Sequence, residues 1–200
     1  MREVTFEKLA HCADTCRERL WDKALSEVLD SPKIILHWTA GYWEQPFDHY
    51  HINITGDGRI LLPSWDLTEK RDHTWKLNTG TIGIALCCAK DATTNDLGEN
   101  PPTAKQIEKI SKTVAILSRH LEVSLNSDNV LTHGEAADNP YLYDDEDLYG
   151  PQNPCSDMRW DLQYLGTPES PEYITDHENP MTGGNVIRGK AIWYLEHLDD

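Results

Sequence analysis

The stretch Lys-Ile-Ile-Leu-His-Trp-Thr-Ala-Gly (33–41) decides how the rest of this chain is interpreted. Its apolar run predicts a strand over 33–38 that ends around His37 and is broken at Gly41. A second short apolar run, over 130–132, also stops at a histidine followed by glycine, His133-Gly134. Functional side chains gather where strands give way to loops. Both histidines are therefore expected to emerge at strand ends and to face one cleft.

Asp161 supplies a third candidate metal ligand, in Arg-Trp-Asp-Leu (159–162). Two neutral imidazoles and one carboxylate, with a fourth position left open, are a recurrent way to hold catalytic zinc. A single histidine is more often a hydrogen-bonded structural residue, and Cys155 is an alternative third ligand. The sequence predicts a Zn²⁺ site formed by His37, His133 and Asp161. Glu135 is expected either to orient His133 or to be exposed.

Periodicity and turn residues predict the remaining elements. A helix is expected over 4–29, with a possible break near 12–15, and strands over 49–55, 59–63 and 80–88. Gly56-Asp57-Gly58 predicts a hairpin between the second and third strands. Thr103 and Gln106 form a capping box, and Ile107, Ile110, Val114, Leu117 and Leu121 then mark the buried face of a helix. The segment 136–158 is expected to be a long loop, and 186–198 a short helix.

The amino-acid composition excludes some classes of function. The 200 residues, 38% of them hydrophobic, can bury one good core. The net charge of −16 argues against nucleic acid as a partner, because phosphate neutralisation supplies most of that affinity. Five cysteines, an odd set without metal-type spacing, fit a reducing compartment. We expect synthesis in the cytoplasm without a signal peptide, and no membrane insertion. The sequence indicates no oligomeric state.

Five motifs, in this order, resemble those of type-2 N-acetylmuramoyl-L-alanine amidases, the zinc amidases that include phage endolysins and peptidoglycan recognition proteins. They are His-Trp-Thr-Ala-Gly (37–41), Tyr-His-Ile-Asn-Ile-Thr-Gly-Asp-Gly-Arg-Ile (50–60), Thr-Ile-Gly-Ile-Ala-Leu (81–86), Thr-His-Gly-Glu (132–135) and Arg-Trp-Asp-Leu (159–162). The resemblance implies an α/β fold, with a mixed central sheet flanked by helices on both faces and zinc at strand ends. It implies a helical extension over 1–30, the amidase domain over 31–166 and a C-terminal extension over 167–200.

The resemblance also implies roles for individual residues. Tyr50 stands where phage-type members carry a catalytic tyrosine, and Arg159 where the family usually has a lysine, so Arg159 would act through its charge alone. His73 matches a histidine that lines the cleft. Trp38, Trp43 and Trp75 are expected around the site, where they would bind substrate by stacking. Ala85 replaces the glutamate that recycling members use on water, so the identity of the general base stays open.

The implied reaction is zinc-dependent hydrolysis of the amide between N-acetylmuramic acid and L-alanine in peptidoglycan. The pair Tyr50 and Ala85 favours a phage or prophage endolysin that acts on the cell wall after release from the cytoplasm. Two alternatives remain. One is a catalytically weak or inactive peptidoglycan-binding module, and the other is a cytosolic muropeptide-recycling amidase.

Overall fold

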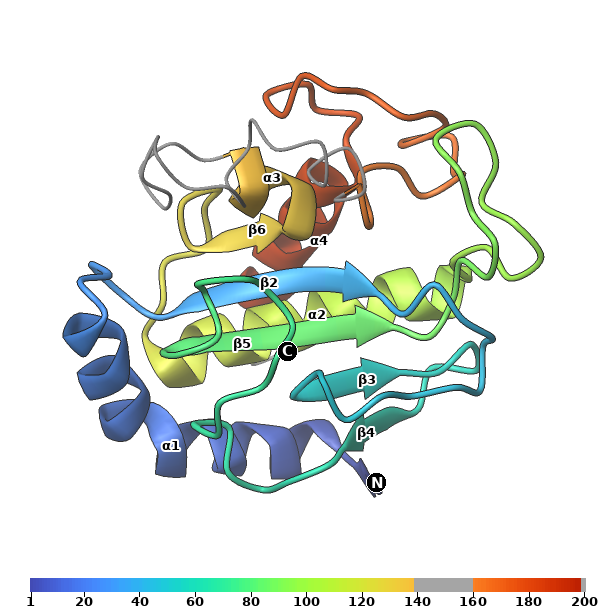
Figure 1. The fold of residues 1–200 in the computed structure, drawn as a ribbon. Helices are drawn as coiled ribbons and strands as arrows, with labels where there is room; N and C mark the ends of the chain where they lie inside the picture. Colours follow the sequence, from blue (N-terminus) through green and yellow to red (C-terminus); the bar gives the residue numbers. More distant parts are fainter. Residues whose placement is uncertain (139–159, 199–200) are drawn as a thin grey trace.

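A six-stranded mixed sheet forms the centre of the computed structural model, which describes residues 1–138 and 160–198 (Figure 1). The order across the sheet is β1-β4-β3-β5-β2-β6. The strands β3, β5, β2 and β6 run parallel to one another, whereas β4 pairs antiparallel with β3 and β1. The strands are β1 (Arg2–Val4), β2 (Lys33–Trp38), β3 (Ile52–Ile54), β4 (Ile60–Leu62), β5 (Thr81–Leu86) and β6 (Val130–Thr132). The predicted α/β fold with a mixed sheet is confirmed.

The two central strands, β2 and β5, place the functional region. Every residue of both strands is buried, as expected for parallel strands covered on both faces. Their register sets His37 beside Ala85. The strand predicted over 33–38 is found with those bounds, while β3, β4 and β5 are shorter than predicted. Gly58, with φ of 88°, lies in the predicted turn between β3 and β4.

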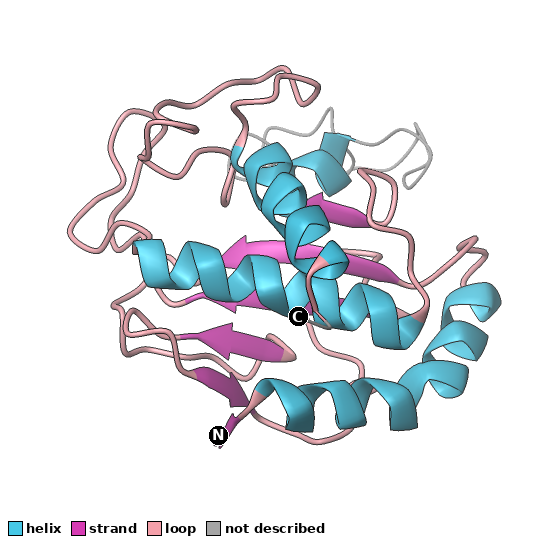
Figure 2. Ribbon diagram, turned by 180° about the vertical axis from the view of Figure 1, so that it is seen from behind, coloured by secondary structure: helices cyan, strands magenta, loops and turns pink. Residues whose placement is uncertain are grey.

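Helices cover the sheet unequally. Figure 2 shows α1 (Phe6–Ser26), α2 (Ala104–Leu121) and α4 (Gly183–Glu196) in front of the sheet, while the short α3 (His133–Asp138) lies toward the opposite face. The predicted helix is found, and the possible break near 12–15 does not occur, because α1 is continuous and buries Cys12, Ala13 and Cys16 against the core. In the described part of the chain, none of the helices has the length and apolarity that a bilayer crossing requires.

One hydrophobic core joins the terminal helices to the sheet. Side chains from α1, the central strands, α2 and α4 share it, including Leu9, Leu20, Ile34, Ile84, Leu117 and Ile187, each less than 2% exposed. The capping box of Thr103 and Gln106 is confirmed, and the predicted apolar face of α2 is buried. These layers fix the carboxyl ends of β2 and β6 side by side.

Candidate metal centre

His37 and His133 meet at the carboxyl ends of two neighbouring parallel strands. His37 is the fifth residue of β2, and its side chain is buried. His133 directly follows β6 and is the first residue of α3. Because β2 and β6 pair in parallel, their ends lie at the same edge of the sheet. The two imidazole rings lie with their centroids 4.7 Å apart and nearly perpendicular, at 81°.

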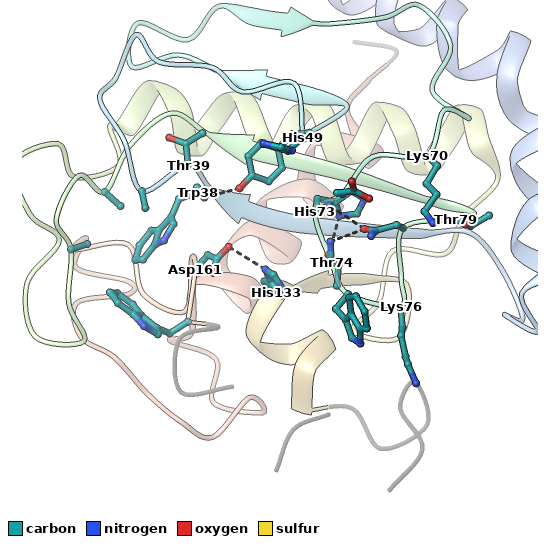
Figure 3. Close-up of a pocket in the computed structure, with 18 of the residues that line it drawn as sticks. Trp38, Thr39, His49, Lys70, His73, Thr74, Lys76, Thr79, His133 and Asp161 are labelled. Carbon is teal, nitrogen blue, oxygen red and sulfur yellow. Dashed lines mark hydrogen bonds and ion pairs between the residues drawn. The ribbon is translucent and has the colours of Figure 1, made fainter. Parts of the chain in front are cut away.

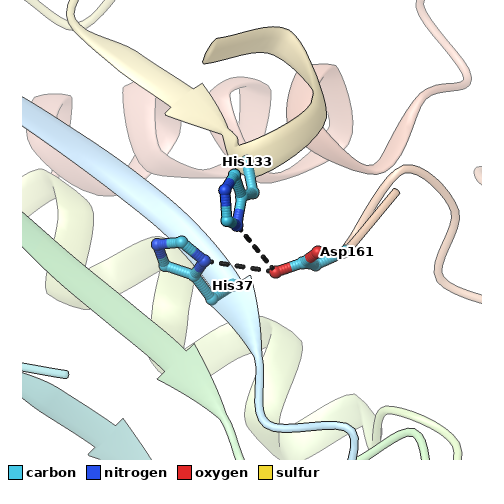
Figure 4. A group of neighbouring side chains, drawn as sticks. All are labelled: His37, His133 and Asp161. Atoms are coloured by element: carbon cyan, nitrogen blue, oxygen red, sulfur yellow. Dashed lines mark hydrogen bonds and ion pairs between the residues drawn. The ribbon is translucent and has the colours of Figure 1, made fainter. Parts of the chain in front are cut away.

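Asp161 completes the group from a distant segment. Its Oδ2 atom lies 3.1 Å from Nδ1 of His37 and 3.5 Å from Nδ1 of His133. Figure 4 shows the carboxylate facing both imidazole rings. One donor atom from each of the three residues lies within 4.8 Å of the other two. The structure therefore brings together the three side chains that the sequence predicted as ligands.

The chemistry of this donor set fits zinc. Burial opposes ionisation of the Asp161 carboxyl, but the imidazoles of His133 and His37 hold its pKa well below its ordinary value. The carboxyl is thus ionised and faces two ring nitrogens. Two imidazole nitrogens and one carboxylate oxygen are ligands that catalytic zinc sites use, with a further position left for water or substrate. Residues His37, His133 and Asp161 could hold such an ion.

A second set of polar groups lies on the far side of the His37 ring. Nε2 of His37 lies 3.3 Å from Nδ1 of His73 and 3.4 Å from Oγ1 of Thr74. Burial lowers the pKa of His73 well below its ordinary value, so this ring is neutral. His73 packs across Gly83 of β5, which has no side chain to obstruct the ring. His73 was predicted to line the cleft, and it also contacts a candidate ligand directly.

A cleft of about 1230 Å³ opens over these residues (Figure 3). The indoles of Trp38 and Trp160 form one part of its wall and pack edge to face, with centroids 5.2 Å apart. Lys70, Trp75 and Lys76 line another part. In Figure 3, Lys70 and Lys76 lie on the opposite side of His133 from Trp38. An elongated substrate could therefore pass over the metal-ligand group between an aromatic and a basic wall.

Tyr50 lies beside His37 in the cleft. The two ring centroids are 5.1 Å apart, and the Tyr50 hydroxyl lies 3.4 Å from the carbonyl oxygen of Trp38, to which it donates. Ala85, the neighbour of His37 on β5, is fully buried and offers no acid or base. A titratable general base therefore does not come from this position.

Other predicted residues lie elsewhere. Trp43 packs over Gly56, its Nε1 donates to the carbonyl of Pro101 at 2.9 Å, and it is absent from the described wall of the cleft. Arg159, Cys155 and most of the predicted loop 136–158 lie outside the described residues, and residues 136–138 are helical. Sequence reasoning missed Trp160, although its place directly before Asp161 was a usable signal. It also missed Lys70, which no local pattern marks.

The amino-acid sequence of this region also matches a known family. The sequence model of the N-acetylmuramoyl-L-alanine amidase family matches residues 29–147, more than half of the chain, including His37 and His133. Asp161 lies beyond the matched residues. Neither the curated proteins nor the solved structures give a match. The chain belongs to the type-2 N-acetylmuramoyl-L-alanine amidases, hydrolases that act on an amide bond of peptidoglycan.

Proposed function

We propose that this enzyme is a zinc-dependent amidase that cleaves the bond between the lactyl group of N-acetylmuramic acid and L-alanine. The convergence of His37, His133 and ionised Asp161 within 4.8 Å at the base of the cleft carries this proposal. When bound to these residues, zinc would supply a water that is acidic enough to attack near neutral pH. Such a centre suits hydrolysis of an unactivated amide.

Tyr50 is proposed to stabilise the reacting carbonyl. Its hydroxyl lies in the cleft and donates to the Trp38 carbonyl at 3.4 Å, a long hydrogen bond. From beside His37, it would donate to the developing oxyanion or to the leaving nitrogen. Arg159, which lies outside the described residues, is proposed from the family resemblance to supply positive charge to the reaction. An arginine keeps its proton, so this role would be electrostatic.

The wall residues are proposed to bind and orient substrate. Trp38, Trp75 and Trp160 line the cleft and can stack on sugar or peptide. His73, which contacts Nε2 of His37, is proposed to fix the orientation of that ring as well as to face the cleft. Trp43 is not proposed to bind substrate, because it packs over Gly56 and does not line the described cleft.

The biological role we propose is that of a phage or prophage endolysin. Support comes from Tyr50 in the cleft together with the buried Ala85 beside His37, the combination of the phage-type branch. In that role the enzyme would be made in the cytoplasm and would act on the cell wall after release. A recycling amidase would instead prefer soluble muropeptide fragments.

The test is the appearance of free N-terminal alanine when the zinc-loaded protein is incubated with purified peptidoglycan, beside the His133→Ala variant. We expect new alanine amines from the wild type alone, with one zinc per chain. Cleavage of soluble anhydro-fragments but not of intact wall would replace the endolysin role by recycling. No cleavage of either substrate, with zinc bound, would indicate a binding module.

A further inference from the structure

The turn that presents His133 is a closed capping box. Oγ1 of Thr132 accepts a hydrogen bond from the backbone N–H of Glu135 at 3.1 Å. Oε2 of Glu135 accepts one from the backbone N–H of Thr132 at 2.7 Å. Both side chains are buried, so Glu135 is not the exposed residue that was one expectation. The reciprocal bonds make Thr132 the N-cap and fix His133 as the first residue of α3.

Arg188 of α4 binds the Glu135 carboxylate of this capping box. Its Nη1 and Nη2 atoms donate to Oε2 and Oε1 of Glu135, each at 2.7 Å, and Nη1 also donates to the carbonyl of Val130 at 2.8 Å. Both side chains of the pair are 6% exposed. Gly184 leaves room for the carboxylate, because a Cβ there would lie 2.7 Å from Oε1. Paired N–H···O bonds of this kind fix direction as well as distance.

Thr132 also connects His133 to the segment of Asp161. Its hydroxyl donates to Oε1 of Gln163 at 3.2 Å, and Gln163 lies two residues after Asp161. The carbonyl of Gln163 accepts from the backbone N–H of Gly183, the first residue of α4, at 3.0 Å. Two ligands that are 28 residues apart in sequence are thus tied to one buried hydrogen-bond network.

We propose that Thr132, Gln163 and Arg188 are positioning residues that hold His133 and Asp161 at the separation that binds the metal. Helix α4 lies beyond the residues matched by the family. It would nevertheless contribute to metal binding, because its Arg188 fixes the turn that carries His133. The inference rests on the proposed zinc function. Groups that orient metal ligands commonly change affinity ten- to a hundredfold when removed.

The first test uses two threonines with the same local bonding. Thr103 caps α2 as Thr132 caps α3, because its Oγ1 accepts from the N–H of Gln106 at 3.1 Å and donates to the carbonyl of Gly56 at 2.8 Å. We expect Thr132→Val to raise the zinc dissociation constant about ten- to a hundredfold, and Thr103→Val to leave it unchanged. Thr132→Ser, which keeps the hydroxyl, should restore the wild-type affinity.

The second test addresses α4. Arg188→Lys keeps the charge but loses the paired donors, and should weaken zinc binding about tenfold. Lys190 provides the control, because it joins α4 to Glu108 of α2 at the surface, and Lys190→Met should leave zinc affinity unchanged. If Thr132→Val does not fold, Gln163→Met is measured in its place. This change leaves the capping box intact and removes the hydrogen bond between Thr132 and the Gln163 side chain.

Zinc affinity is measured by competition with a chromophoric chelator, without substrate. Unchanged affinity in Thr132→Val, Gln163→Met and Arg188→Lys, with one zinc bound per wild-type chain, would overturn the positioning role and leave the proposed function intact. Equal weakening in the Thr103→Val and Lys190→Met controls would also overturn it, because the effect would then be general destabilisation. A wild type that binds no zinc would overturn both proposals.

Discussion

Gly83 of β5 offers a direct test of how the His37 ring is held. A Cβ at this position would lie 2.6 Å from Cγ of His73, and 2.8 and 2.9 Å from Cδ2 and Nδ1. Ordinary contact begins at 3.4 Å, so Gly83→Ala must displace the ring by about 0.8 Å. His73 is buried and its Nδ1 lies 3.3 Å from Nε2 of His37, so the displaced ring is pushed against a candidate metal ligand. Overpacking of this kind costs about 1–3 kcal/mol.

Two measurements follow for Gly83→Ala. Urea denaturation of the zinc-free protein should show the lost stability, and chelator competition should show about tenfold weaker zinc binding or more. Gly189→Ala is the matched control. Gly189 lies within α4 with no atom within 4 Å of its added Cβ, so this change should raise the free energy of unfolding by about 0.5–1 kcal/mol. Wild-type stability and zinc affinity in Gly83→Ala would refute the reasoning.

Three further outcomes are expected. Tyr50→Phe should keep zinc and KM but lower kcat about a hundred- to a thousandfold, as loss of an oxyanion donor does, and an unchanged kcat would remove Tyr50 from the reaction. Asp161→Ala should abolish zinc binding in elemental analysis, whereas Cys155→Ala should keep one zinc per chain, and the opposite result would exchange their roles. His51 is buried, accepts from the Gly83 N–H at 3.0 Å, and burial lowers its pKa to about 4. Because the folded pKa lies below the unfolded value of 6.5, the neutral ring contributes stability above pH 6.5 that is lost as pH falls toward 4. The free energy of unfolding of the zinc-free protein should therefore fall by about 3 kcal/mol over this pH range. In His51→Gln the free energy of unfolding should depend less on pH, and an equally steep dependence would contradict the assignment.

Strong local patterns in the sequence were sufficient for much of the fold. The run over 33–38 was predicted with its observed bounds, because a central parallel strand is apolar on both faces and Gly41 breaks the run. The helix after Thr103 followed from its capping box. Strand β1 was missed, since a three-residue edge strand with two charged residues has no alternation to detect. Helix α3 was missed because His133-Gly134 was taken as a break, although Thr132 and Glu135 carry the capping signature.

The candidate site, like the fold, was predicted only where local sequence patterns mark its residues. The three candidate ligands were predicted from strand ends and family motifs, which are short-range signals. The partner of Glu135 is Arg188, 53 residues away, and no local pattern predicts which helix supplies that cation. Likewise, the contact between His37 and His73 depends on how the loop before β5 packs across Gly83. Contacts of this kind follow from tertiary packing and not from periodicity.

The strand order has a further consequence for self-association. Both border strands, β1 and β6, are three residues long. A second chain adding itself to either border would find a template for few backbone hydrogen bonds, and short edges of this kind are one way in which natural sheets avoid aggregation. The net charge of −16 adds repulsion between copies. Short borders and like charge therefore both oppose edge-to-edge pairing of the described sheet.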